Sequence, residues 1–332
     1  IMQSLTTTHF MKKPFIKRIC WGAAVAGALL SVSALAQEKI DRVLDTDSKP
    51  FVEMEHVYGK ADIKTWDKNQ VRITGTLGEL TEEFTFEKRG NSVVIDVEVK
   101  NNHYRWEDKD EAKDNLTVYV PVGSRFAYET VNANVKIEGP QGGTSIEVVN
   151  GDIEGRNLGG KVSVESVNGD IELKGITSML TVEAVNGDIE VEHDSTEPLE
   201  VVSVNGKIDV RSNSREVSVE TVNGDSSLEL VEVDDLEMTS VNGDARVSMS
   251  LADNADVEVD TVGGSITLNF SGDVSARFEL EAHAGGSIRN NINDSKVSKA
   301  KYGPGQWIDF TEGNGNSRVR VSTVNGRVTV SK

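Results

Sequence analysis

Carboxylates recur in this sequence at a nearly constant interval. Asp152, Asp170 and Asp188 each follow a Val-Asn-Gly tripeptide, and they lie 18 residues apart. Hard cations such as Ca²⁺ bind clusters of oxygen ligands, so an acidic face that binds divalent cations is one hypothesis. However, the Gly-Gly-x-Gly-x-Asp calcium repeat is missing, and Lys207 interrupts the series. The favoured interpretation is a solvated acidic wall without a metal site.

No arrangement of residues in the sequence indicates catalysis. Beyond residue 36 the histidines are His56, His103, His193 and His283. They lack the close spacing of a metal site and are expected at the surface. There is no nucleophile elbow, phosphate-binding loop or nucleotide-binding unit, and carboxylates are too frequent for a neighbouring pair to indicate acid–base chemistry. We therefore predict a protein without catalytic residues and without a cofactor.

One segment gathers aromatic side chains in a chain that has few of them. The sequence from Asn101 to Trp106 precedes a highly charged run that extends to Asp114. Loops on a rigid body frequently carry binding residues. In the alternative, structural interpretation, Trp106 packs over the first coil beneath a solvated tip. We predict a partner-binding loop whose contacts are His103, Tyr104, Arg105 and Trp106.

The elements that must position these side chains are repeats. The tripeptide Val-Asn-Gly occurs six times, with gaps of 18, 18, 19, 18 and 19 residues between its asparagines, and a seventh copy stands near the C-terminus. A constant period near 20 residues indicates one supersecondary unit that is stacked many times. The predicted structural corner residues are Asn150, Gly151, Asn168, Gly169, Asn186, Gly187, Asn205, Gly206, Asn223, Gly224, Asn242, Gly243, Asn325 and Gly326.

Strands are predicted on both sides of each corner. Apolar and polar residues alternate there, as in Val164 to Leu173 and in Val182 to Val191, which is typical of half-buried strands. Asn-Gly between two such runs is also a hairpin signal, so a meander of hairpins is one possibility. The whole motif repeats, and not only the turn. We therefore favour a β-solenoid, in which equivalent side chains stack about 4.8 Å apart.

The alternation also predicts which side chains face the core. Ile171 and Leu173 point inward, and so does the small residue two places before each asparagine, such as Ser166. We expect the asparagine side chains to turn inward and bond to one another as a ladder. The glycine would supply the positive φ of the corner. Strict alternation places Val167 outside, unless a β-bulge interrupts it.

The first 36 residues are typical of a targeting segment. Four basic residues precede an apolar run from Ile19 to Leu30, and Ala34-Leu35-Ala36 has the small-x-small pattern of a cleavage site. We predict an upstream extension and a signal peptide that starts at Met11 and is removed before Gln37. The protein would then be exported, to the periplasm or to the cell surface or medium. The only cysteine, Cys20, lies in this segment, so the remainder has no disulfide.

The chain after residue 36 is strongly acidic. It has 31 lysine and arginine residues against 54 aspartate and glutamate residues, a formal net charge of −23, because the first 36 residues hold four basic and no acidic side chains. Such a charge argues against nucleic acid or an anionic membrane as a direct partner. No second apolar segment of membrane-spanning length follows.

We divide the chain into four parts. Residues 1–36 are the extension and signal peptide, 37–130 an irregular β region at the N-terminal end of the solenoid, and 131–288 the regular repeats. Residues 289–332 combine an insertion rich in turn signals with a C-terminal capping coil. Caps are expected at both ends, because open strand edges recruit other strands.

The repeats resemble a known family. The recurring Val-Glu-x-Val-Asn-Gly-Asp-Ile-Glu-Val sequence, the lead-in Val118–Gly123 and the closing Val321–Val328 are similar to the bacterial "putative adhesin" β-strand-repeat family of uncharacterised exported proteins. This resemblance implies a single-domain, right-handed parallel β-helix with 18 to 19 residues per coil. A left-handed hexapeptide helix is the alternative, but Ile171 stands where that helix needs a small residue. The right-handed preference of parallel β crossovers points the same way.

These observations predict a non-enzymatic structural or interaction protein of the cell envelope or surface, similar to an adhesin. Its partner would be an envelope protein or a glycan, and the chain is expected to be a monomer. One alternative is a solenoid that binds divalent cations. Another is a β-helical enzyme that acts on polysaccharides, although short coils and acidic walls suit polyanionic substrates poorly.

Overall fold

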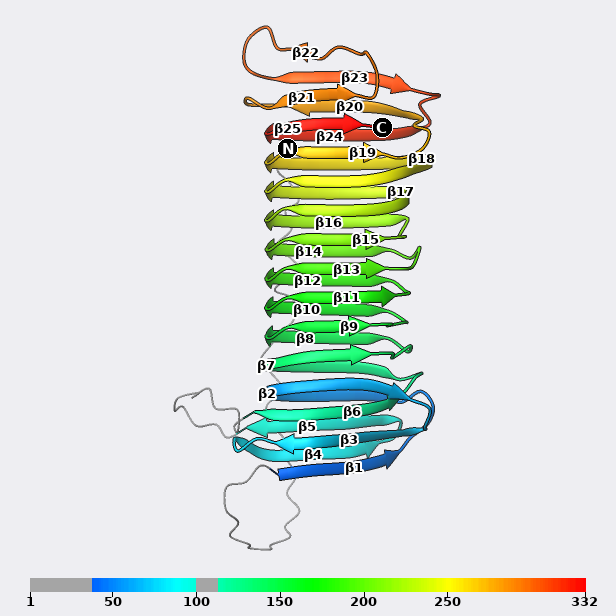
Figure 1. The fold of residues 1–332 in the computed structure, drawn as a ribbon, viewed down its shortest axis with the longest axis vertical. Coiled ribbons are helices and arrows are strands. Elements are labelled where there is room, and N and C mark those ends of the chain that lie inside the picture. The colour runs from blue at the N-terminus through cyan, green and yellow to red at the C-terminus, as the bar shows by residue number, and fades with distance from the viewer. Residues whose placement is uncertain (1–37, 100–112) are drawn as a thin grey trace, which may run out of the picture. The chain divides into compact units, whose positions relative to one another are not determined.

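The chain beyond its first segment folds as a stack of β-coils (Figure 1). The computed structural model describes residues 38–99 and 113–332, and every regular element in these ranges is a β-strand. None of the described residues forms a helix with the length and apolar character needed to cross a bilayer. The prediction of an all-β solenoid is therefore confirmed.

Each regular coil contributes one strand to each of two parallel sheets. The strands of the first sheet end at the corner asparagines, and pairing is in register, so that Asn168 lies between Asn150 and Asn186. Equivalent residues are 18 or 19 positions apart, as predicted. The first sheet contains β8 (Thr144–Asn150), β10 (Val162–Asn168), β12 (Leu180–Asn186), β14 (Leu199–Asn205) and β16 (Glu216–Asn223). The second contains β9 (Ile153–Arg156), β11 (Ile171–Ile176), β13 (Ile189–His193) and β15 (Ile208–Ser212).

Four longer strands bend around a corner and so belong to both sheets. β2 and β7 pass the corner that is equivalent to Asn-Gly, whereas β17 and β18 pass the opposite one. Their backbone hydrogen bonds continue on both sides of the bend. The four strands are β2 (Phe51–Trp66), β7 (Arg125–Glu138), β17 (Ser226–Asn242) and β18 (Ala245–Gly263).

The interior is a narrow layer of aliphatic side chains between the two sheets. Val164 and Leu173 are fully buried, and burial of one such side chain stabilises the fold by about 1.5–3 kcal/mol. Ser166, Ala184 and Ser203 share the buried position two places before the corner asparagine. The two serine hydroxyls make no hydrogen bond within the described part of the chain. This position therefore requires a small volume rather than a hydroxyl group.

The N-terminal end of the stack is irregular and partly antiparallel. β2 runs parallel to β5, β6 and β7, whereas β1 with β3, β3 with β6 and β4 with β5 are antiparallel pairs. The terminal strand β1 is mostly exposed and charged, which discourages pairing with strands of other molecules. The bounds are β1 (Glu38–Asp45), β3 (Gln70–Leu77), β4 (Thr81–Arg89), β5 (Ser92–Val99) and β6 (Asp114–Pro121).

The last coil of the chain lies inside the stack, not at its end. β24 pairs in parallel with β18 on one side and with β20 on the other, and β25 lies between β19 and β21. We expected 289–332 to end in a capping coil. Instead the coil of Asn325 lies between β18 and β20, so the cap consists of β20 to β23. The bounds are β19 (Ile266–Phe270), β20 (Ala276–Ala282), β21 (Ser287–Asn291), β22 (Ser298–Lys299), β23 (Gln306–Glu312), β24 (Ser317–Asn325) and β25 (Arg327–Ser331).

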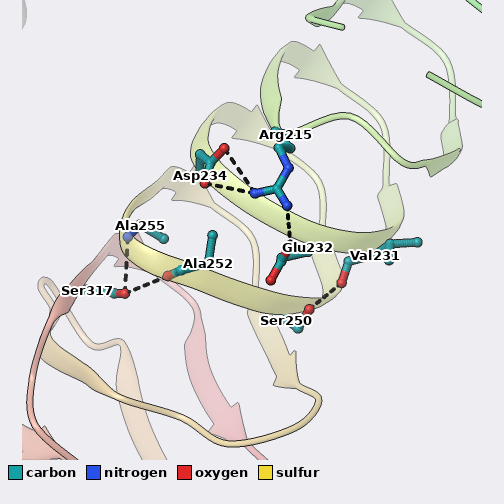
Figure 2. A network of polar contacts seen from close by, with 8 residues as sticks. All are labelled: Arg215, Val231, Glu232, Asp234, Ser250, Ala252, Ala255 and Ser317. Atoms are coloured by element: carbon teal, nitrogen blue, oxygen red, sulfur yellow. Dashed lines mark hydrogen bonds and ion pairs between the residues drawn. The ribbon is translucent and has the colours of Figure 1, made fainter. Parts of the chain in front are cut away.

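Ser317 anchors this inserted coil to the bend of β18. Its buried hydroxyl donates to the carbonyl of Ala252 at 3.0 Å and accepts the N–H of Ala255 at 3.1 Å (Figure 2). These bonds satisfy backbone groups at a place where the strand turns away from its ladder. Arg215 supports the bend of β17 in the coil below, where its guanidinium contacts the carboxylates of Glu232 and Asp234 (Figure 2).

Candidate functional site

The corner asparagines form a continuous ladder on the surface. The Nδ2 atom of Asn168 donates to Oδ1 of Asn150 at 2.9 Å. The same bond links successive corners from Asn132 to Asn242 at 2.9–3.1 Å. The expectation that these side chains turn inward is wrong, because the asparagines from Asn150 to Asn242 are exposed. The backbone turns directly after each asparagine, which carries the amide out of the core while the bonds along the stack persist.

The corner glycines pack directly against backbone of the preceding coil. The six from Gly151 to Gly243 have φ between +135° and +145°, a region that is essentially restricted to glycine. A Cβ atom added at Gly187 would lie 2.1 Å from the carbonyl oxygen of Gly169. A Cβ atom added at Gly326 would lie 1.9 Å from the carbonyl oxygen of Gly264. Asn325 pairs in register with Gly263. Close stacking thus excludes any side chain at these glycines.

The aspartates that follow the corner glycines bind backbone groups. Oδ1 of Asp152 accepts the N–H of Asp170 at 3.1 Å, Asp170 accepts the N–H of Asp188 at 2.9 Å, and Asp188 accepts the N–H of Lys207 at 2.8 Å. Asn134 precedes this series and its amide oxygen accepts the N–H of Asp152 at 3.0 Å. Within residues 38–99 and 113–332, no group of three or more His, Cys, Asp or Glu residues is arranged to hold a metal ion. The geometry gives these carboxylates a structural role at the corner.

The substitution Asp170→Asn should leave the free energy of unfolding nearly unchanged, because the amide oxygen can accept the same bond, as that of Asn134 does. Asp170→Ala should lower it by about 0.5–1 kcal/mol, because the N–H of Asp188 loses its protein acceptor. Urea denaturation followed by circular dichroism measures both changes. Equal losses in the two variants would mean that the charge, rather than the acceptor, matters.

The outer face of the first sheet carries two columns of side chains in register. One is a column of carboxylates. The other is a column of valines, which lie two residues further along each strand and are half-buried or exposed. Val167 thus lies outside, as strict alternation predicts. In strand order the carboxylates are Asp96, Glu55, Glu129, Glu147, Glu165 and Glu183. The valines are Val57, Val131, Val149, Val167, Val185, Val204, Val222, Val241, Val262 and Val324.

Like charges crowd one another at the N-terminal end of the carboxylate column. Partial burial raises the pKa of Glu55, and the neighbouring Asp96 and Glu129 raise it further. The pKa of Asp96 is raised in the same way, by partial burial and then by Glu98 and Glu83. The ionised carboxylates are therefore unfavourable to one another, and a positively charged partner would relieve this repulsion.

On the outer face of the second sheet, carboxylates pair with basic side chains, as Asp256 and Glu258 of the first sheet do with Arg318 and Arg320. Nζ of Lys174 lies 2.8 Å from Glu172 and 3.2 Å from Glu190. Arg156 lies 3.0 Å from Glu172 as well. Exposed pairs of this kind contribute little stability, about 0–1 kcal/mol each, but they neutralise much of the charge on this face. The first sheet differs in carrying the column of valines, whereas the outward residues of β9 to β15 are mostly charged.

Two histidines that we expected at the surface are buried. His56 and His193 are each almost wholly inaccessible, which corrects the prediction. The Nε2 atom of His193 donates to the carbonyl of Ser178 at 2.7 Å, and burial lowers its pKa. The sequence contained the signal, because both residues continue inward-facing series, Val52-Met54-His56 and Ile189-Val191-His193. His283 is exposed, as expected.

His56 is the centre of a buried polar network near the N-terminal end. Its Nε2 atom lies 3.1 Å from Oδ2 of Asp114, and its Nδ1 atom lies 2.9 Å from the hydroxyl of Tyr128. The carboxylate oxygen accepts the bond from Nε2, and the second bond joins the other ring nitrogen to the tyrosine hydroxyl. Asp114 also accepts the N–H of Gly78 at 2.6 Å and the hydroxyl of Thr81 at 2.9 Å. Closed to solvent, the network ties β2, β6 and β7 together.

The predicted partner-binding loop lies outside the described residues. This applies to His103, Tyr104, Arg105 and Trp106, so the loop stays a prediction. The residues that follow it are described. Lys113 and Asp114 line a surface depression of about 630 Å³ together with Tyr58, Lys60 and the first corner asparagines.

These features define a β-solenoid repeat protein whose surface is built from regular columns of side chains. The chain belongs to the family described as Toastrack DUF4097, whose sequence model matches residues 60–331. The expected membership in a family of uncharacterised repeat proteins is thereby confirmed.

Two solved structures cover most of the chain at low identity. One is described as a "putative cell adhesion protein" from Clostridium sporogenes, with 9% identity over 89% of this chain and 99% of that chain and a TM-score of 0.25. The other is a "putative adhesin" from Bacteroides fragilis, with 13% identity over 89% of this chain and 98% of that chain and a TM-score of 0.31. Likeness at this level carries no argument about mechanism. No curated protein sequence matches the chain.

Proposed function

We propose that this chain is an exported, non-enzymatic interaction protein of the cell envelope or surface, with an adhesin-like role. Export is inferred from the targeting pattern in residues 1–36. The observation that carries the proposal is the outer face of the first sheet, where a column of valines continues from coil to coil beside a column of carboxylates that extends as far as Glu183. A rigid, repetitive face of this kind suits binding along an extended surface rather than conversion of a small substrate.

The chemistry of this face favours a protein partner over a glycan. Valine side chains offer no hydrogen bonds to sugar hydroxyls, whereas they can pack against apolar side chains. The raised pKa values of Glu55 and Asp96 favour lysine or arginine opposite these two carboxylates. The partner would therefore be an envelope protein that presents an apolar strip flanked by basic residues.

Site-specific photo-crosslinking in intact cells tests this proposal. A photoreactive amino acid at Val167, on the first sheet, should yield a defined covalent adduct with one envelope protein. The same amino acid at Thr267, which is half-buried on the second sheet, is the matched control and should yield none. The further change Val185→Asp should reduce the Val167 adduct at least about tenfold, the loss of one well-packed interface contact.

The outcomes are distinct. Equal adducts from Val167 and Thr267, or none from Val167, would overturn binding through the first sheet. A third probe at Trp106 tests the loop predicted from the sequence, and an adduct there alone would assign the interaction to the loop instead.

A further inference from the structure

The C-terminal cap carries a surface unlike the rest of the solenoid. Tyr302 has 86% of its surface exposed and Trp307 has 42%, and no other aromatic side chain in the described ranges is comparably exposed. Both lie in or beside the hairpin of β22 and β23, at the end of the stack opposite β1 (Figure 1). Exposed aromatic rings in a chain that buries its phenylalanines inside this cap indicate a contact surface.

The same region reverses the charge of the molecule. Between residues 289 and 307 there are four basic side chains and only one acidic one, Asp294, in a chain whose formal net charge is −19. All four are exposed, and none of them forms an ion pair with another described residue. In the second sheet, by contrast, arginine and lysine pair with glutamate. The four basic residues are Arg289, Lys296, Lys299 and Lys301.

The hairpin pairs with the body through β23, while its tip stands clear of neighbouring atoms. A backbone bond from Ala300 to Gly305, at 2.9 Å, closes the loop that carries Tyr302. A Cβ atom added at Gly303 would meet no other atom within 4 Å, so the tip faces open space. The Trp307 backbone is paired with Glu281 on one side and with Ser298 on the other, which fixes the position from which its ring projects. The backbone pairing of β23 thus fixes where Trp307 emerges, and the tip carries Tyr302 out into solvent.

We propose that this basic aromatic tip, defined as Arg289, Lys296, Lys299, Lys301, Tyr302 and Trp307, binds an acidic polysaccharide. The Lys301 ammonium lies over one face of the Tyr302 ring, 5.5 Å from its centroid. The other face of Tyr302 and the exposed part of Trp307 attract the weakly positive C–H edges of sugar rings. The ammonium and guanidinium groups form charge-assisted hydrogen bonds with carboxylate or sulfate groups along the polymer. This inference goes beyond the proposed function, because it concerns a second surface with a different ligand.

A glycan fits the tip better than a lipid surface does. Binding to a bilayer scales with the apolar area that can be inserted, and the neighbouring Ile292 is buried while Val297 packs partly against the core. Only two rings thus remain for insertion. Screening over about 8 Å at physiological ionic strength confines the attraction to the tip itself, so that the acidic coils behind it do not prevent a flexible polymer from binding there.

Binding of polygalacturonate to the protein tests the proposal, with methyl-esterified polygalacturonate as the polymer of equal backbone and little charge. Dextran sulfate distinguishes sulfate from carboxylate recognition. We expect the charged polymers, or one of them, to bind at least about tenfold more tightly than the ester, and salt to weaken binding. The double change Lys299→Ala and Lys301→Ala should weaken it at least about tenfold, and Tyr302→Ala should do likewise. Lys64→Ala with Lys161→Ala, two exposed lysines elsewhere, is the matched control and should have no effect.

The outcomes that would overturn the proposal are equally specific. The proposal is overturned if neither charged polymer binds, or if the esterified polymer binds as tightly as the charged ones. It is also overturned if the tip variants bind as tightly as the unaltered protein. Vesicles of phosphatidylglycerol and phosphatidylcholine form a further arm, and tip-dependent binding to vesicles without binding to the polymers would also overturn it. Because Tyr302 is almost wholly exposed, its replacement leaves the fold intact, so a loss of binding is interpretable. The crosslinking experiment at Val167 reports on another face and can fail or succeed independently.

Discussion

Replacement of Gly187 by alanine should destabilise the protein by at least about 3 kcal/mol. Its φ of +142° is accessible to glycine and strained for any other residue. The added Cβ would also lie 2.1 Å from the carbonyl oxygen of Gly169. The corner cannot shift to avoid this contact, because Gly206 of the next coil approaches Gly187 just as closely. The free energy of unfolding, obtained from urea denaturation, measures the effect.

Gly90→Ala is the matched control for this prediction. Gly90 has a φ of +67°, so alanine is strained there too, but a Cβ would meet no atom within 4 Å. The expected loss is about 1 kcal/mol, the cost of the left-handed conformation alone. If Gly187→Ala and Gly90→Ala cost the same, close stacking of the corners does not limit the choice of residue at the corner.

The corner illustrates what could be predicted from the sequence. A turn after each asparagine, glycine at the tightest point, and a ladder of amide bonds all follow from a motif that repeats with its flanking strands. The direction of the asparagine side chain did not follow, because alternation describes a straight strand. It fails at the residue where the strand ends, and Asn168 is therefore exposed although parity with Ser166 places it inside.

Buried polar residues were missed for a different reason. His56 and His193 occupy inward positions that the alternation identifies, but residue type alone favours the surface for histidine. Their burial depends on partners that are distant in sequence, such as Asp114, which is 58 residues from His56. A single sequence does not reveal such pairings. It equally conceals that the coil of Asn325 is inserted between two earlier coils.

The candidate surfaces were predictable only in part. The valine and carboxylate columns follow from the repeat, since residues at equal offsets from each asparagine must align. The cap surface does not, because the exposure of Tyr302 and Trp307 depends on how an irregular insertion folds. Its turn signals indicate only that the chain reverses there. The surface of the regular repeats can therefore be predicted from their periodicity, whereas the surface of an insertion requires its three-dimensional structure.

Replacement of Asp114 by alanine should be comparably damaging, with a loss of about 3–5 kcal/mol, since removal of one partner from a buried polar network leaves the others unsatisfied. Three donors lose their acceptor at once: the ring of His56, the N–H of Gly78 and the hydroxyl of Thr81. Asp114→Asn should cost less, because its amide keeps one acceptor oxygen. Tyr128→Phe should cost about 1 kcal/mol, the value of a single hydrogen bond.

The strands in which hydrogen exchange accelerates in Asp114→Ala are a sharper test of the network than the loss of stability. Because the network joins β2, β6 and β7, hydrogen exchange in Asp114→Ala should accelerate first in β1 to β6, while β10 to β16 keep their protection. Coils of a solenoid contact only their neighbours, so instability at one end need not reach the middle. Uniform acceleration along the whole stack would show that the solenoid unfolds as one cooperative unit and that the network supports more than its own end.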